Sequence, residues 1–400
     1  MKAYERFLKY APIPTMSDEG SETCPSTKKQ LKLANLLCEE LLELGLSDAR
    51  VDEFGYVYAT LPANKDGKPA IGFIAHMDTS PDASDENIKP RLVKYEGGDI
   101  LLNEEKEIYM KVSDYPYLEN YKGHTLITSD GTTLIGADDK AGIAEILTML
   151  EKIIASGAPH GKICIGFTPD EEIGRGADRF DVESFGADFA YTVDGGAIGE
   201  LEYENFNAAS AKITVNGVSI HPGSAKDKMK NAARIAMEFN TLLTVDEIPE
   251  KTSGYEGFHH LTSMSGEVEL ARLSYIIRDH DMKKFEAKKA EFVRCAKIIN
   301  ERYGEGTLLL ELVDSYYNMR EKIEPCMYIV ERAEKAMRAL GVTPIKSPIR
   351  GGTDGARLSF MGLPCPNLST GGENFHSRFE FVSCEAMEKI SDILVNIATL

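Results

Sequence analysis

Short apolar runs alternate with longer stretches of helical periodicity in the first half of the chain. Residues 70–75, 164–167 and 189–193 are nearly continuous apolar runs, typical of strands buried on both faces. Between the first two runs, apolar residues recur at helical spacing over residues 143–154. Strands that alternate with helices predict an α/β fold, a mixed sheet with helices on both faces. In such sheets, functional residues gather beyond the carboxyl ends of the strands.

The pattern changes near residue 207. Ile213 and Val215 alternate with polar residues before Asn216-Gly217, a dipeptide typical of hairpin turns. After it come a helical pattern, a strand pattern, a second helical pattern and a last strand pattern, at 235–243, 268–277, 285–299 and 307–313. Strands with one polar face and two helices on the other predict a smaller α+β domain of ferredoxin-like type. We expect this inserted domain to span residues 207–317, and residues 1–206 and 318–400 to form the main domain.

Charge and cysteine usage narrow the classes of protein. Lys and Arg total 45 against 64 Asp and Glu, a formal charge of -19. This excess of acid disfavours binding to nucleic acid or to an anionic membrane. The seven cysteines are scattered and never spaced as CxxC, which argues against a disulfide framework and a cysteine-based zinc site. Because there is also no apolar signal-peptide core and no run of about 18 apolar residues, we expect a cytoplasmic protein.

Acidic and imidazole side chains follow each of the three apolar strands. His76 and Asp78 follow the first strand, the acidic run 170–172 follows the second, and Asp194 follows the third. The pair Asp138-Asp139 precedes the helical stretch, and a further imidazole, His376, lies near the C-terminus. Taken singly, these groups have ordinary explanations: a solvated turn, a helix N-cap and hydrogen-bonded structural histidines.

The combination points to a metal centre. Carboxylates and histidines at the ends of buried strands are costly unless a cation gathers their charge. His and carboxylate ligands without cysteine predict zinc, with cobalt or manganese as substitutes. A two-metal hydrolase needs a bridging carboxylate, a His and a carboxylate for each ion, and one further carboxylate as base. The sequence supplies these six residues.

Five segments, AHMDTS, GADDKAG, PDEEIGRG, YTVDGG and ENFHS, resemble the motifs of the di-zinc aminopeptidase/carboxypeptidase/aminoacylase family. The resemblance extends over essentially the whole chain. It implies that Asp138 bridges two zinc ions. The further ligands implied for one ion are His76 and Asp194, after the first and third strands. Those implied for the other ion are Glu172, after the second strand, and His376, near the C-terminus.

The same resemblance implies roles for three other residues, and two arginines are further candidates for binding substrate. Glu171 is the implied general base, and Asp78 the residue that fixes the tautomer of His76 by a hydrogen bond. His221 is implied to stabilise the oxyanion. Arg350, followed by two glycines, is placed to grip a substrate carboxylate, and Arg278 is a second candidate. For Arg278 we favour a structural role instead, through pairing with the flanking Asp279 or Asp281.

The resemblance therefore implies a zinc-dependent aminopeptidase that releases the N-terminal residue from tripeptides. It also implies that the inserted domain serves as a lid or dimerisation domain, and that the protein forms a homodimer. A dipeptidase, a carboxypeptidase or an N-acyl amino acid deacylase would use the same metal machinery. A non-catalytic binding homologue would be free to lose Glu171 or Asp138, and both are present. A Walker loop and a GxGxxG motif after a strand are absent, which argues against a nucleotide-dependent enzyme.

Overall fold

The computed structural model describes residues 1–400 and divides into two compact units. Unit 1 comprises Met1–Tyr203, Met319–Ser347 and Thr353–Leu400, and unit 2 comprises Glu204–Asn318 and Pro348–Gly352. The expected boundaries, 206/207 and 317/318, lie within a few residues of these. The short segment 348–352 was expected in the main domain but groups with unit 2, because the Ile349 N–H donates to the Glu204 carbonyl at 2.8 Å.

The main sheet of unit 1 is mixed. Its seven strands run in the order β1-β2-β8-β3-β9-β15-β10, with β8, β3, β9 and β15 parallel and the outer pairs antiparallel. Parallel neighbours end at one edge of a sheet, so the segments after β3, β8 and β9 leave it together. The bounds are β1 (Arg50–Val51), β2 (Val57–Leu61), β3 (Ile71–His76), β8 (Ile163–Thr168), β9 (Phe189–Gly195), β10 (Leu201–Glu202) and β15 (Asn367–Ser369).

Helices cover both faces of this sheet, as the apolar strands predict. On one face, the Tyr191 hydroxyl donates to the Ile329 carbonyl at 2.6 Å, and α3 packs against β3 and β9. On the other face, a Cβ at Gly72 would meet the ring of Phe185 at 2.5 Å, so α4, which contains Phe185, packs closely on the sheet. The helices are α1 (Ala3–Tyr10), α2 (Gln30–Glu43), α3 (Ala137–Ser156), α4 (Val182–Phe185), α7 (Arg320–Ile323), α8 (Tyr328–Ala339), α9 (Asp354–Phe360) and α10 (Cys384–Thr399). None of the helices is long and apolar enough to cross a membrane.

A second sheet and a hairpin complete unit 1, and the sequence pattern did not reveal them. The order β16-β17-β7-β4 is antiparallel throughout, and β5 pairs with β6. These strands have two to four residues, too short for a clear period-2 signal. Their bounds are β4 (Arg91–Lys94), β5 (Ile100–Asn103), β6 (Ile108–Met110), β7 (Thr125–Thr128), β16 (Gly372–Glu373) and β17 (Phe381–Ser383).

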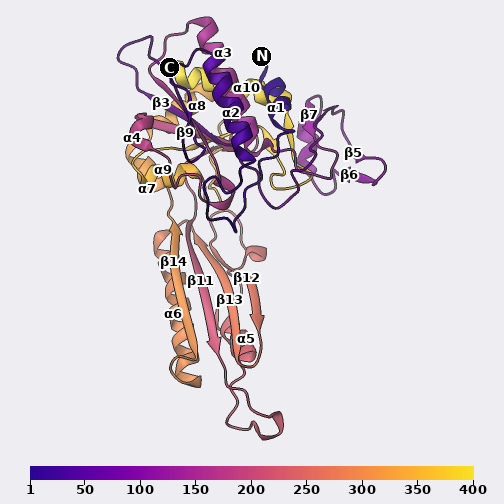
Figure 1. Ribbon diagram of the computed structural model, residues 1–400, viewed down its shortest axis with the longest axis vertical. Coiled ribbons are helices and arrows are strands. Elements are labelled where there is room, and N and C mark those ends of the chain that lie inside the picture. The colour runs from indigo at the N-terminus through magenta and orange to yellow at the C-terminus, as the bar shows by residue number, and fades with distance from the viewer. The chain divides into compact units, whose positions relative to one another are not determined.

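Unit 2 is a four-stranded antiparallel sheet with two helices, in the ferredoxin-like order (Figure 1). The chain runs β11 (Asn207–Asn216), α5 (Ala232–Leu242), β12 (Phe258–Gly266), β13 (Leu270–Asp279), α6 (Met282–Tyr303) and β14 (Leu308–Tyr316), and the sheet order is β12-β13-β11-β14. Strand β12 was not predicted, because most of its residues are polar or exposed. The hairpin turn predicted at Asn216-Gly217 is wrong: the chain continues into a loop before α5. Gly217 is needed there because a Cβ would lie 2.0 Å from the Val268 carbonyl oxygen.

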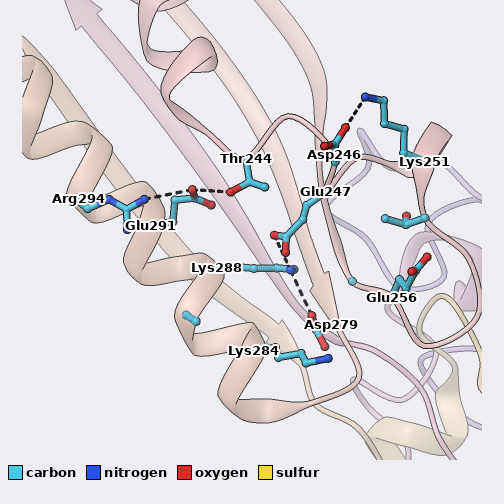
Figure 2. A pocket seen from close by; sticks show the side chains of 13 residues that line it. Thr244, Asp246, Glu247, Lys251, Glu256, Asp279, Lys284, Lys288, Glu291 and Arg294 are labelled. Atoms are coloured by element: carbon cyan, nitrogen blue, oxygen red, sulfur yellow. Dashed lines mark hydrogen bonds and ion pairs between the residues drawn. The ribbon is translucent and has the colours of Figure 1, made fainter.

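A pocket of about 680 Å³ in unit 2 is lined mainly by charged side chains (Figure 2). At its centre, the buried ammonium of Lys288 lies 2.6 Å from Glu247 and 3.4 Å from Asp279. Glu291 accepts from Thr244 and pairs with Arg294. The ion pairs and hydrogen bonds of these side chains hold α6 to the neighbouring loop and strand. Because their charges largely neutralise one another, the pocket does not resemble the predicted metal centre.

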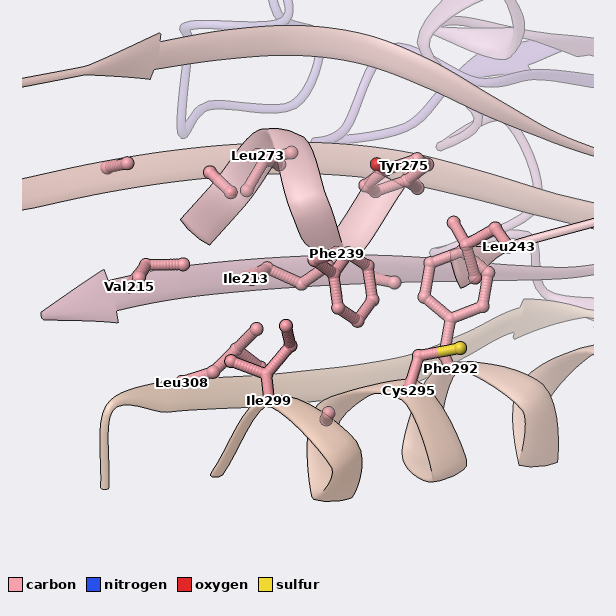
Figure 3. Close-up of a cluster of buried hydrophobic side chains, with 14 of the residues drawn as sticks. Ile213, Val215, Phe239, Leu243, Leu273, Tyr275, Phe292, Cys295, Ile299 and Leu308 are labelled. Atoms are coloured by element: carbon pink, nitrogen blue, oxygen red, sulfur yellow. The ribbon is translucent and has the colours of Figure 1, made fainter. Parts of the chain in front are cut away.

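The core of unit 2 lies between the sheet and its two helices (Figure 3). Alternate residues of β11, including Ile213 and Val215, point to the same face as Leu273 of β13 and are almost fully buried. Phe239 of α5 and Phe292 of α6 pack over them, with ring centroids 5.9 Å apart. Alternation along the strands therefore gives this sheet one apolar face, as the sequence predicts.

Candidate active site

The end of β3 places His76 at the centre of the candidate site. Its side chain is only 2% exposed, and its Nδ1–H donates to the backbone carbonyl of Asp78 at 3.0 Å. The Asp78 carboxylate lies 3.4 Å from the same nitrogen, and it also accepts the backbone N–H groups of Glu171 and Glu172 at 3.0 and 3.2 Å. Asp78 thus holds His76 mainly through its carbonyl, and its carboxylate fixes the acidic turn after β8.

The buried carboxylate of Asp170 anchors that acidic turn. Asp170 has φ 61°, and it accepts hydrogen bonds from Ser26 and Gln30 between 2.5 and 2.7 Å. The short 3-10 helix Glu171–Ile173 follows and projects both glutamates. The Glu171 carboxylate makes no hydrogen bond or ion pair, which leaves its oxygens available for proton transfer.

The segment before α3 presents Asp138. Asp138 and Asp139 have non-helical backbone angles, their shared peptide bond is cis, and neither side chain caps the helix. The Asp138 N–H donates to Glu380 at 2.9 Å, and the Asp139 carboxylate accepts the N–H of His76 at 3.1 Å. The ordinary explanation of this pair, a helix N-cap, therefore does not account for it. Its backbone is instead fixed by neighbouring elements.

Asp138 reaches both histidines. Its Oδ1 lies 2.8 Å from His76 Nε2, and its Oδ2 lies 3.4 Å from His376 Nε2. Asp194, at the end of β9, lies 3.4 Å from His76 Nε2, and Glu172 lies 2.9 Å from His376 Nε2. Residues separated by 300 positions in the sequence thus converge around one carboxylate.

The five side chains form two overlapping groups that fit two metal ions. His76, Asp138 and Asp194 offer ligand atoms that all lie within 4.8 Å of one another, and so do Asp138, Glu172 and His376. Glu172 Oε1 is buried without a hydrogen-bond partner, as expected of an oxygen that could bind a cation. The donor set is imidazole and carboxylate only, which suits zinc and similar divalent metals.

The electrostatics of the cluster also favour a cation. Burial, with the charge of Asp138, raises the pKa of Glu172 to about 8 and that of Asp194 to about 6. Burial, with the charge of Asp194, raises the pKa of Glu171 well above its usual range. Burial opposes ionisation of Asp138 too, but hydrogen bonds from the two histidines outweigh it and lower its pKa. These carboxylates repel one another in a site largely shielded from water, and divalent cations would relieve that repulsion.

The three residues expected to bind substrate lie in unit 2. His221 is exposed, and its Nδ1 accepts from the Gly223 N–H at 3.1 Å. The Arg350 guanidinium donates to the carbonyls of Thr252, Gly254 and Glu256 and lies over two phenylalanine rings. Its donors therefore hold the loop 252–256.

Arg278 is not paired with its acidic neighbours, so that prediction is wrong. Its guanidinium lies over the Tyr316 ring, 5.1 Å from the centroid. Successive side chains of a strand point to opposite faces, which separates Arg278 from Asp279. Asp279 faces Lys288 instead, and Asp281 accepts the Lys284 N–H at the start of α6.

Two supporting acids were missed by the sequence reasoning. Glu380 is buried and accepts the N–H groups of Ile135, Gly136 and Asp138 at 2.8, 2.8 and 2.9 Å. Asp82 lies 3.1 Å from His376 Nδ1. An acid between the two phenylalanines at 379 and 381 was the available signal for Glu380, since a buried charge needs several donors.

Comparisons with known proteins agree with the fold. Residues 203–306 match the family described as peptidase dimerisation domain, of the M20 peptidases. Among solved structures, the aminopeptidase PepT of Bacillus cereus superposes with a TM-score of 0.79 at 24% identity, covering 100% of this chain and 97% of that one. A Staphylococcus aureus tripeptidase superposes with a TM-score of 0.80 at 21% identity, covering 100% and 97%. The fold and the two-group cluster define a metallopeptidase.

Curated relatives identify the family of the chain. Peptidase T of Halothermothrix orenii is 59% identical over 100% of this chain and 98% of its own length. Peptidase T of Clostridium acetobutylicum is also 59% identical, over 99% and 98%. The chain belongs to the peptidase T family.

Proposed function

We propose that this protein is a two-metal aminopeptidase that releases the N-terminal residue from tripeptides. The observation that carries the proposal is the position of Asp138, whose two oxygens face His76 and His376 separately. The substrate class follows from family membership and from the tripeptidase activity named for a protein of the same fold.

The proposed metals are two zinc ions, with cobalt or manganese as substitutes. Asp138 is the proposed bridge, with two further ligands for each ion, His76 and Asp194 for one, Glu172 and His376 for the other. When bound, the ions would polarise the scissile carbonyl and lower the pKa of a shared water.

Glu171 is the proposed general base. It stands directly before the ligand Glu172 on a turn held by Asp78 and Asp170, and its own carboxylate is free of partners. A carboxylate with a pKa raised by burial and by Asp194 is suited to accept a proton and then release it. Glu171 would take the proton of the attacking water and pass it to the departing amine.

We propose that His221 is a substrate-binding residue that donates to the developing oxyanion. Its ring is exposed and only Nδ1 is engaged, so Nε2 is free to donate. Arg350 would meet a substrate carboxylate only after releasing its carbonyl partners, and Arg278 only after leaving Tyr316.

We further propose a homodimer formed through unit 2, in a cytoplasmic setting. The match of residues 203–306 to a peptidase dimerisation domain supports the dimer, and the residues of the edge strand β12 are largely exposed. All seven cysteines are free, which is typical of a reducing compartment. Light scattering coupled to gel filtration measures the assembly directly.

Three matched peptides test the function: Ala-Ala, Ala-Ala-Ala, and Ala-Ala-Ala with an acetylated N-terminus. The zinc-loaded enzyme should cleave only the free tripeptide, release its first residue, and lose activity with a chelator. Equal cleavage of the acetylated peptide would leave a metal-dependent hydrolase but would contradict an aminopeptidase. Faster cleavage of Ala-Ala would contradict the tripeptide preference.

A further inference from the structure

The two histidines of the cluster differ in how firmly they are held. The His76 side chain is 2% exposed and is fixed from the same strand end by Asp78. The His376 side chain is 44% exposed and has φ 60°, a left-handed backbone that is uncommon outside glycine. Its loop therefore gives His376 little packing to hold its ring in one orientation.

The remaining ring nitrogen of His376 meets the segment after β3. His376 Nδ1 lies 3.1 Å from the Asp82 carboxylate and 3.2 Å from the Ser80 hydroxyl. The backbone N–H of Asp82 in turn donates to Ser80 at 3.3 Å, which sets the two acceptors side by side. These contacts join segments that are almost 300 residues apart in the sequence.

An acceptor at Nδ1 decides the orientation and tautomer of the ring. With the proton on Nδ1, the Nε2 lone pair faces Glu172 and Asp138, where a metal ligand is required. Asp82 is the charged acceptor, so it also makes the imidazole a stronger donor to a cation. Asp78 orients His76 in the corresponding way, mainly through its backbone carbonyl. The two histidines are thus supported independently.

We propose that Asp82 is the positioning residue of His376, and that it sets the affinity of the metal site shared with Glu172 without affecting the His76 site. This inference rests on the two-metal centre of the proposed function. Asp82 does not touch the substrate or the reacting atoms in this role. It acts only through the orientation and basicity of His376.

A purely structural role for Asp82 predicts a different result. Its side chain is 68% exposed, and its only side-chain hydrogen bond is with His376. Exposed ion pairs contribute little to stability, so its replacement should leave the fold intact. Loss of a ligand's hydrogen-bond partner typically costs 10–100-fold in metal affinity. Metal binding and fold stability therefore separate the two roles.

The experiment titrates metal-free full-length protein with Co²⁺ while the visible absorbance and bound metal are measured. Asp82→Ala and Asp82→Asn are compared with the unaltered protein and with Glu86→Gln. Glu86 is an exposed acid of the same segment with no ion pair, so its replacement makes the same charge change elsewhere.

We expect the first equivalent of Co²⁺ to bind all four proteins equally, and the second to bind Asp82→Ala about 10–100-fold more weakly. Asp82→Asn should fall between, because its amide oxygen still accepts a hydrogen bond. At saturating metal, peptide turnover of both variants should recover. Equal loss at both sites, or no loss at either, would overturn the inference. If the unaltered protein binds fewer than two ions, the two-metal proposal itself fails.

Should Asp82→Ala unfold on purification, Asp82→Asn decides the question, because it preserves the size of the side chain. Thermal unfolding of each metal-free variant verifies the fold before titration. A weaker second site in Asp82→Asn with an unchanged midpoint supports the positioning role. An unchanged second site in Asp82→Asn, with Asp82→Ala unfolded, would contradict it.

Discussion

The carboxylate of Glu380 accepts the backbone N–H of Asp138 at 2.9 Å, and so fixes the position of the residue on which the whole cluster converges. Its other oxygen accepts the N–H groups of Ile135 and Gly136, both at 2.8 Å. A glutamine has one acceptor oxygen and one donating amide, so it cannot serve all three donors.

Glu380→Gln should therefore lower the free energy of unfolding by about 1–3 kcal/mol, the cost of leaving a buried donor unsatisfied. It should also reduce bound metal, because Asp138 loses its backbone support. Denaturant unfolding and metal analysis measure the two effects. Glu331→Gln, an exposed acid of α8 without an ion pair, provides the control and should change neither.

Glu171→Gln should bind metal normally and lose most of its turnover. General acid–base catalysis contributes about 10²–10⁴-fold, and a glutamine cannot accept the proton of the water. Single-turnover assays and metal content on the same preparation check the result. Asp138→Ala is the matched comparison and should lose metal. A comparable loss of metal in Glu171→Gln would contradict the base assignment.

Metal removal should destabilise the protein. The carboxylates of the cluster repel one another, and a ligand that binds only the folded state stabilises it by about 2.7 kcal/mol at 100 times its Kd. Calorimetry should show a lower midpoint after chelation, restored by stoichiometric Zn²⁺. An identical midpoint with and without metal would argue that the cluster holds no ion.

Glu145 should make stability fall with rising pH. Its side chain is 0% exposed, neither oxygen has a hydrogen-bond partner, and burial, with the charge of Glu388, raises its pKa well above 4.5. Below the unfolded pKa both states hold the proton. Above it the unfolded chain releases the proton while the folded chain keeps it, so stability declines by up to ~1.4 kcal/mol per pH unit until the folded group ionises.

Glu145→Gln should remove this contribution and be more stable than the unaltered protein near pH 8. Denaturant midpoints across pH 4–8 measure the difference in slope between the two proteins. Glu311→Gln, an exposed acid on β14, is the control and should preserve the original slope. A variant that tracks the unaltered protein at every pH would show that Glu145 is ionised in the fold.

Gly217→Ala should destabilise unit 2 by about 1–3 kcal/mol, the usual range for overpacking. The added Cβ would lie 2.0 Å from the Val268 carbonyl oxygen and 2.5 Å from that of Lys230. Both neighbours are backbone and cannot rotate away. Gly351→Ala, where a Cβ meets nothing within 4 Å, should leave the denaturant midpoint unchanged.

Local sequence pattern predicts the long elements and the chemical types at their ends. The apolar runs that became β3, β8 and β9 are unambiguous because both of their faces are buried, and α3 has a clear helical period. His76 and Asp194 are recognisable because each lies at the end of such a strand, and the acidic turn because it follows one. In unit 2, the alternation of apolar and polar residues along β11 and β13 predicts the apolar face that the two helices cover.

Tertiary structure decided what local pattern cannot encode. Strands of two to four residues, such as β16 and β17, take their conformation from their partners, so they carry too little period to be recognised. Arg278 was separated from Asp279 by the pleat of β13, and the Glu380 and Asp82 contacts exist only because distant segments meet. A hydrogen bond between residues 62 to 296 positions apart depends on the topology of the sheet, because side-chain orientation and distance are fixed only when the strands are assembled.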